Sequence, residues 1–166
     1  MRIKIKDFLL EKVIKYNSAN MKEIRIIYPG KTKSDFINAG INEYIKFLKS
    51  YAKIELIQIK QGTGNRENII NEESDRILEK IKEDITLLDV QGKNLSSEEF
   101  SQFINKENKL NFVIGGHLGV SDKLKQKAKY RISLSKMTFT HEMSRLILLE
   151  QIYRAFAILK GKKYHY

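Results

Sequence analysis

The chain has 166 residues, carries a formal net charge of +11 at pH 7 and contains no cysteine. Its length suits one domain with a substantial core. The absence of cysteine excludes a disulfide framework, a thiolate nucleophile and a cysteine-based zinc site. The sequence has no run of eighteen apolar residues and no signal-peptide pattern at its start. We therefore expect a cytoplasmic protein with no membrane-spanning segment.

Most of the positive charge lies in the last third of the chain. Residues 119–166 contain eleven Lys or Arg against three Asp or Glu, a net of +8, whereas the first 118 residues have a net of +3. A segment charged in this way attracts polyanions, of which nucleic acid is the commonest in a cell. A solvated lysine-rich face explains the charge alone equally well.

The first twenty residues are interpreted as an extension. Apolar residues from Ile5 to Tyr16 lie at helical spacing among lysines, which is typical of a basic amphipathic helix. The pattern of a folded domain begins only at Met21. We predict a peripheral extension over residues 1–20 and a single domain over residues 21–166.

Strand and helix patterns then alternate. Residues 23–28 read as a strand that ends at Pro29-Gly30, residues 34–50 as a helix and residues 52–59 as a second strand. The polar residues 61–73 are expected to form a mobile loop, followed by a helix over 73–83. The strand–helix–strand order implies a right-handed crossover between parallel strands.

The alternation continues to the end of the chain. Residues 85–90, 112–114 and 131–134 read as strands, and a long apolar helix is expected over 141–160. Ser96 and Glu99 have the spacing of a capping box, and Ser121 or Asp122 can cap a lysine-rich helix. This order predicts the α/β class, with a mostly parallel sheet and flanking helices.

Turn-forming residues follow three of these strands, over 88–93, 114–119 and 134–139. Ligands of open α/β sheets bind beyond the carboxyl ends of the strands, so we expect a small-molecule cleft there, with the last two strands ending side by side. The Gly115-Gly116 turn fits neither the Gly-x-Gly-x-x-Gly fingerprint nor the Walker loop. Nicotinamide dinucleotides and nucleoside triphosphates are therefore disfavoured.

Three side chains are candidates for chemistry. His117 lies in a glycine turn, where a histidine is more often a surface residue. His141 opens the long helix, where a role at the helix end explains it as well as proton transfer does. Arg154 either pairs with Glu150 four residues earlier or points at an anionic or carbonyl-bearing substrate. No paired ligand spacing such as His-Glu-x-x-His occurs, so we expect no metal site.

The long helix and the tail favour association with partners. The helix is apolar on nearly all sides between Leu146 and Leu159, which predicts contact with the sheet on one side and with a second subunit on another. The tail, residues 160–166, interleaves aromatic and cationic side chains. Such a tail suits a flipped base and its phosphates, and a frayed basic end is the alternative.

Several segments resemble the ribosomal RNA large-subunit methyltransferase H family. In chain order they are MKEIRIIYPGK, YAKIELIQI, FVIGG, LSKMTF, HEMSRLILLEQIYRAF and the final YH. The likeness runs from Met21 to Tyr166 and implies a SPOUT-type α/β methyltransferase with a C-terminal trefoil knot, working as a homodimer. One departure is Thr140, where the family usually has a proline before the histidine.

The resemblance also implies a function. The expected reaction is methyl transfer from S-adenosyl-L-methionine to N3 of a pseudouridine in the 23S rRNA of the assembled ribosome. Catalytic roles are implied for Arg154, Tyr164 and His165. Two alternatives stay open, namely a non-catalytic ribosome-binding or assembly factor and a SPOUT methyltransferase with a tRNA target. The residues implied in cofactor binding lie at the three strand ends, and they are Leu88, Gly115, Leu134, Ser135, Lys136, Met137, Thr138 and Phe139.

Overall fold

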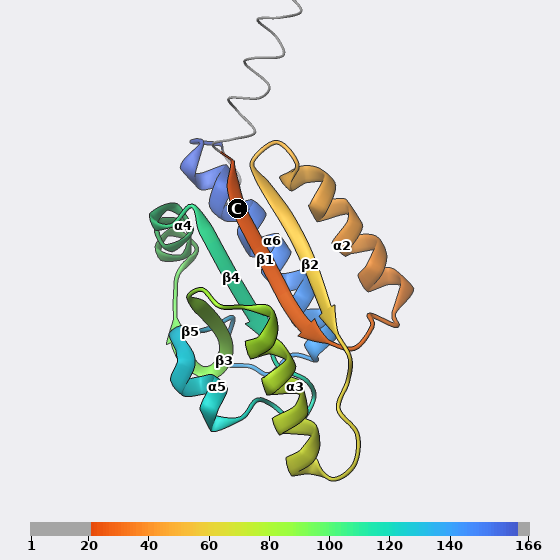
Figure 1. Cartoon of the computed structure of the whole chain (residues 1–166). Helices are drawn as coiled ribbons and strands as arrows, with labels where there is room; N and C mark the ends of the chain where they lie inside the picture. The colour runs from red at the N-terminus through yellow and green to blue at the C-terminus, as the bar shows by residue number, and fades with distance from the viewer. Residues whose placement is uncertain (1–20, 163–166) are drawn as a thin grey trace, which may run out of the picture.

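Strands and helices alternate along the whole of residues 21–162, the part of the chain that the computed structural model describes (Figure 1). The five strands form one sheet in the order β2-β1-β4-β3-β5, and all four neighbouring pairs are parallel. The predicted α/β class with a parallel sheet is confirmed, and the predicted extension over residues 1–20 lies outside the described residues. The elements are β1 (Lys22–Pro29), α2 (Asp35–Leu48), β2 (Ala52–Ile59), α3 (Arg66–Lys80), β3 (Ile85–Asn94), α4 (Ser97–Lys106), β4 (Lys109–Ile114), α5 (Asp122–Lys127), β5 (Ala128–Ser133) and α6 (His141–Leu159).

The alternating side chains of β1, an interior strand of the sheet, divide the core into two layers. Ile24 and Ile26 belong to the layer that α2, α4 and α6 cover, and Ile27 belongs to the layer under α3 and α5. All three side chains are fully buried, and each such burial stabilises the fold by about 1.5–3 kcal/mol. The sheet is therefore the middle of three layers, with polar turns at its two ends.

The prediction of a loop over residues 61–73 is wrong in its second half, because α3 begins at Arg66. The Asn65 side chain caps this helix by accepting a hydrogen bond of 2.9 Å from the Asn68 N–H group. The helix was hard to recognise because only three of its residues, Glu73, Ser74 and Ile77, are buried. Two of these are polar, so the apolar spacing that marks an amphipathic helix is nearly absent.

The other predicted helix starts agree with the structure. Ser96 and Glu99 form the capping box at the start of α4, and the Ser121 side chain caps α5. Ser34 lies at the N-cap of α2 without a side-chain cap bond. Instead, the Glu142 carboxylate of α6 accepts hydrogen bonds from the N–H groups of Lys33 and Ser34, at 3.1 and 3.2 Å.

Strand β3 bends sharply where it pairs with the edge strand β5. Leu88 and Lys93 both pair with Ile132, so residues 89–92 loop out of the sheet. A Cβ atom on Gly92 would lie 2.7 Å from backbone atoms of Arg131 and Ile132, so the bend needs a residue without a side chain. The expectation that β4 and β5 end side by side is wrong, because β3 lies between them.

Helix α6 packs against both α2 and α4 and against the sheet. These three neighbours within one chain already explain much of its apolar surface. The predicted contact with a second subunit and the trefoil knot stay predictions. No helix within residues 21–162 combines the length and the apolar character that a membrane crossing requires.

Candidate cofactor and active site

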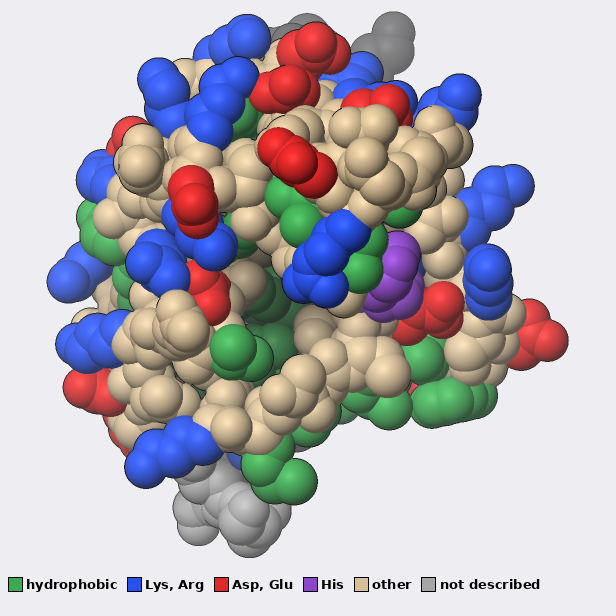
Figure 2. Space-filling view, turned by 90° about the horizontal axis from the view of Figure 1, so that it is seen from below, with side chains coloured by type: hydrophobic (Ala, Val, Ile, Leu, Met, Phe, Trp, Pro, Cys, Tyr) green, Lys and Arg blue, Asp and Glu red, His purple; other side chains and the backbone are tan. Residues whose placement is uncertain are grey.

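A cavity of about 780 Å³ opens at the carboxyl ends of β3, β4 and β5. Figure 2 shows this end of the molecule, with a hollow whose floor is apolar and a histidine at one side. The volume lies in the range of small-molecule and cofactor sites. The lining comes from the looped-out part of β3, the turn after β4, and the segment that joins β5 to α6, over residues 88–91, 114–120, 133–135, 137–141 and the side chains Lys125 and Ser144.

The structure brings together seven of the eight residues that the resemblance implies in cofactor binding. The seven that line the cavity are Leu88, Gly115, Leu134, Ser135, Met137, Thr138 and Phe139, whereas Lys136 is exposed and does not line it. Two hydrogen bonds between residues two positions apart fold the start of the 134–138 segment into a tight turn. Ser133 Oγ donates to Ser135 O at 2.7 Å, and Met137 N donates to Ser135 Oγ at 3.0 Å. Cofactor contact at these residues stays a prediction.

An ion pair fixes the looped-out part of β3 at the cavity edge. Asp89 Oδ2 accepts hydrogen bonds from Arg131 Nε at 3.1 Å and Nη2 at 2.6 Å, and its Oδ1 accepts one from Gln91 N. Burial favours the neutral carboxyl, but these contacts outweigh it and lower the pKa of Asp89 below its ordinary value. At neutral pH the ionised Asp89 carboxylate is therefore paired with the Arg131 guanidinium at the cavity edge.

The glycine turn after β4 packs directly on α3. The Glu73 side chain is 3% exposed, and its carboxylate fills the space that a Cβ atom on Gly116 would occupy. Glu73 Oε1 also accepts a hydrogen bond of 3.0 Å from Gly62 N, and Ser74 Oγ accepts one of 2.9 Å from Ser121 N. Helix α3 thus holds both ends of the turn that forms one wall of the cavity.

The start of α6 forms the opposite wall, and Arg145 anchors it. Thr140, the departure from the usual proline, caps the helix by accepting a bond of 3.2 Å from Met143 N. Arg145 is 1% exposed, stacks 3.9 Å from the ring centroid of Tyr28, and donates to Thr32 Oγ1 at 2.7 Å and to Pro29 O at 2.9 Å. The first turn of α6 is therefore tied to the end of β1.

The two candidate histidines both line the cavity. His117 is exposed at the tip of the glycine turn, whereas His141 is half-buried on the first turn of α6. Burial and the nearby Arg145 guanidinium lower the pKa of His141 below its ordinary value, against the opposing pull of Glu142. His141 is therefore neutral at pH 7, and its unprotonated ring nitrogen can accept a proton.

Arg154, the one implied catalytic residue that the structure describes, does not line the cavity of its own chain. Arg154 lies thirteen positions after His141 on α6, which is about 20 Å along a helix that rises 1.5 Å per residue. Its guanidinium contacts Glu150 Oε1 at 3.0 and 2.7 Å, as the i, i+4 spacing predicted. Tyr164 and His165 lie outside the described residues.

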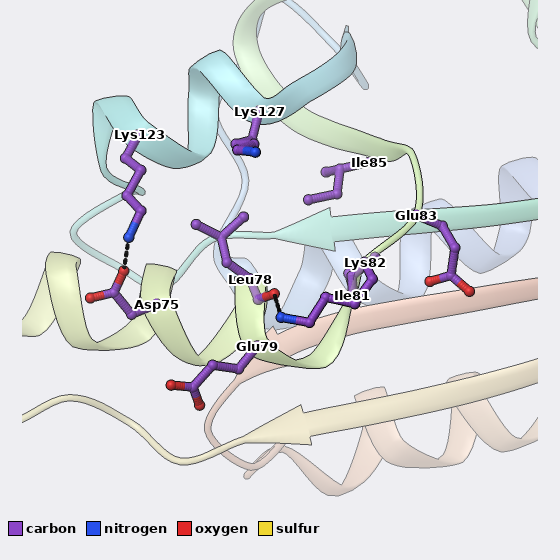
Figure 3. Close-up of a pocket in the computed structure, with 9 residues that line it drawn as sticks. All are labelled: Asp75, Leu78, Glu79, Ile81, Lys82, Glu83, Ile85, Lys123 and Lys127. Atoms are coloured by element: carbon purple, nitrogen blue, oxygen red, sulfur yellow. Dashed lines mark hydrogen bonds and ion pairs between the residues drawn. The ribbon is translucent and has the colours of Figure 1, made fainter.

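A second cavity, of about 550 Å³, lies between α3 and α5 (Figure 3). Lys123 of α5 reaches across it to Asp75 of α3 at 2.8 Å. Three lysines and three carboxylates line it, so it has no net charge with which to select an ionic ligand. Nowhere in residues 21–162 do three or more metal-ligating side chains converge. The strand-end cavity is the better candidate site.

Sequence reasoning did not single out the residues that hold the cavity walls. Asp89 and Arg145 left a signal, because each is a charged residue within an otherwise apolar strand or helix pattern. Glu73 left none, because it lies among other polar residues, and Arg131 stands between Tyr130 and Ile132 with nothing that marks Asp89 as its partner. Arg131 acts through Asp89, which lies 42 positions earlier in the chain. Glu73 acts through Gly62, whose place depends on the path of the β2–α3 loop.

Comparison with known proteins shows the family of the chain. Residues 21–165 match the family described as "Predicted SPOUT methyltransferase". A protein of Thermodesulfovibrio yellowstonii named Ribosomal RNA large subunit methyltransferase H is 52% identical, over 88% of this chain and 100% of its own length. Proteins with the same name from Carboxydothermus hydrogenoformans and Enterococcus faecalis are 42% and 41% identical, each over 86% of this chain and 99% of the relative. The chain belongs to the SPOUT methyltransferase family.

Proposed function

We propose that this protein transfers a methyl group from S-adenosyl-L-methionine to N3 of a pseudouridine in 23S rRNA, with the assembled ribosome as its substrate. The observation that carries the proposal is the strand-end cavity, lined by the motif residues of a family whose relatives of this chain are named Ribosomal RNA large subunit methyltransferase H. Because ribosomes are in the cytoplasm, the proposed reaction would take place there.

The lining of the cavity fits the proposed cofactor. Leu88, Leu134 and Phe139 offer apolar walls for an adenine ring, and the turns at Gly115 and Ser135 bring backbone polar groups to the same space. When bound, S-adenosyl-L-methionine supplies an electrophilic methyl group.

A homodimer is part of the proposal, because Arg154 lies about 20 Å along α6 from the cavity wall of its own chain. A second copy of the chain could bring Arg154 of the partner subunit to this cavity. The face formed by α2 and α6 suits such contact, because Phe36 and Phe47 of α2 are 65% and 45% exposed there. Exposed large apolar side chains of this kind mark interaction surfaces.

The assignment of roles follows from the charge that develops. N3 of the base becomes nucleophilic as its proton leaves, and negative charge spreads over the imide. Arg154 would stabilise this charge electrostatically, and Tyr164 and His165 would orient the base. Covering the cavity would exclude water and strengthen these interactions.

The test is a methylation assay with purified protein and ribosomes from a strain that lacks this methyl group. We expect one methyl group per 23S rRNA on a pseudouridine, with assembled ribosomes preferred over free 23S rRNA. Methylation of tRNA instead would favour the alternative substrate. Ribosome binding with no uptake of S-adenosyl-L-methionine in calorimetry would favour the non-catalytic assembly factor.

A further inference from the structure

We propose that His141 is the group that accepts the N3 proton of the target base during methyl transfer. This inference rests on the proposed function and assigns a catalytic residue within the same site. It starts from the position of His141, on the first turn of α6 and within the lining of the cavity. The Thr140 cap and the Arg145 anchor fix that turn, so the imidazole stands at a defined place on the wall.

Within the part of the chain that the structure describes, only three lining side chains can act as a proton acceptor near neutral pH, namely Asp89, His117 and His141. Asp89 is a weak base, because both of its oxygens already accept hydrogen bonds from Arg131 and Gln91. His117 is exposed at the tip of a turn, where solvent competes for its ring nitrogens. His141 alone combines partial burial with a place on a rigid element.

The charged groups around His141 keep it ready to accept a proton. Arg145 of α6 and His117 of the β4–α5 turn disfavour the imidazolium, whereas Glu142 of α6 and Glu73 of α3 favour it. Both carboxylates are engaged elsewhere: Glu142 accepts from the N–H groups after β1, and Glu73 accepts from Gly62 N. Neither is bonded to the imidazole, so the ring is free to bind the N3–H group of a base.

The proposed step transfers one proton and one methyl group. The N3–H bond breaks and its proton moves to the unprotonated ring nitrogen of His141. The electron pair left on N3 forms the new bond to the methyl carbon, and the carbon–sulfur bond breaks with its pair on sulfur. The sulfonium becomes the neutral thioether S-adenosylhomocysteine, and the imidazolium returns its proton to water after the product leaves.

The experiment measures single-turnover methyl transfer to ribosomes at saturating S-adenosyl-L-methionine between pH 5 and 9. For the wild type we expect the rate to rise with pH through an apparent pKa below the ordinary value of histidine, about 6.5, and then to level off. His141→Asn should lower the rate about 100-fold or more and abolish the rise. His117→Asn is the comparison variant, because it changes the same residue type in the same cavity. It should lower the rate far less than His141→Asn and keep the rise with pH, at a slightly higher apparent pKa because His117 also disfavours the His141 imidazolium.

The affinity for S-adenosyl-L-methionine, measured by calorimetry, should stay within a factor of about three in both variants, and added imidazole should restore part of the rate of His141→Gly. A wild-type rate that keeps rising above pH 8 would overturn the proposal even if no variant folds. An active His141→Asn enzyme that keeps the rise would overturn it while leaving the proposed function intact. A wild type that methylates no ribosome would refute the proposed function itself and this inference with it.

Discussion

Replacing Arg145 with Met should weaken both the fold and the binding of the methyl donor. The change removes the donors to Pro29 O and Thr32 Oγ1 and the stacking on Tyr28. A buried carbonyl left without a partner costs about 1–3 kcal/mol, and stacking at a desolvated site contributes about 2 kcal/mol. Removing a buried charge whose Nε has no hydrogen-bond partner offsets part of this loss. We expect a net destabilisation of about 2 kcal/mol.

Urea unfolding measures the stability, and calorimetry measures the affinity for S-adenosyl-L-methionine. Since Arg145 ties the first turn of α6 to β1, the wall at His141 should shift and the affinity should fall about tenfold. Arg76→Met is the matched control: its guanidinium also makes hydrogen bonds, to Lys60 O and Gln61 O, but its side chain is partly exposed. It should cost less than about 1 kcal/mol. Equal small losses in both variants and an unchanged affinity would refute the role of Arg145.

Three further changes follow from the same structure. Gly92→Val should lower the melting temperature and the cofactor affinity, because a Cβ atom there lies 2.7 Å from the backbone of β5; calorimetry showing wild-type values would contradict this reading of the bend. Replacing Phe36 and Phe47 with Glu should yield a folded monomer in sedimentation analysis that binds S-adenosyl-L-methionine but transfers no methyl group, and an unchanged dimer would exclude that face. The folded state lowers the pKa of Asp89, so its stabilising contribution is complete above about pH 4 and is lost as the pH falls through the folded pKa. Asp89→Asn should therefore reduce stability by about 1 kcal/mol at pH 7 and by much less at pH 2 in urea unfolding, whereas an equal loss at both values would rule out the ionised carboxylate as the cause.

Apolar periodicity predicted the fold because the strands are buried on both faces. Continuous runs such as Phe112 to Ile114 lie in a central strand, and the order of strands and helices then implied a parallel sheet. Strand order was not predictable in this way. The position of β3 between β4 and β5 depends on a crossover that skips a strand, and no local pattern encodes it.

The candidate site was predicted in its place and in most of its lining, through the rule on strand ends and the family motifs. The contacts that hold this site in shape were not predicted. Arg145, Glu73 and the Asp89–Arg131 pair act through contacts between residues far apart in the chain or through the path of a loop. Glu73 accepts from a backbone N–H group and Arg145 donates to a backbone carbonyl, and a backbone group has no signature in the sequence.

We propose that the strand-end cavity delivers a methyl group to 23S rRNA. The most direct measurement is mass spectrometry of 23S rRNA from a strain that lacks this gene, carrying either the wild type or a variant whose cavity is blocked by Gly115→Trp. We expect the methylated pseudouridine to be absent from the strain, to return with the wild type and to stay absent with the blocked variant. A methylated pseudouridine that persists without the gene, or returns with the blocked cavity, would contradict it.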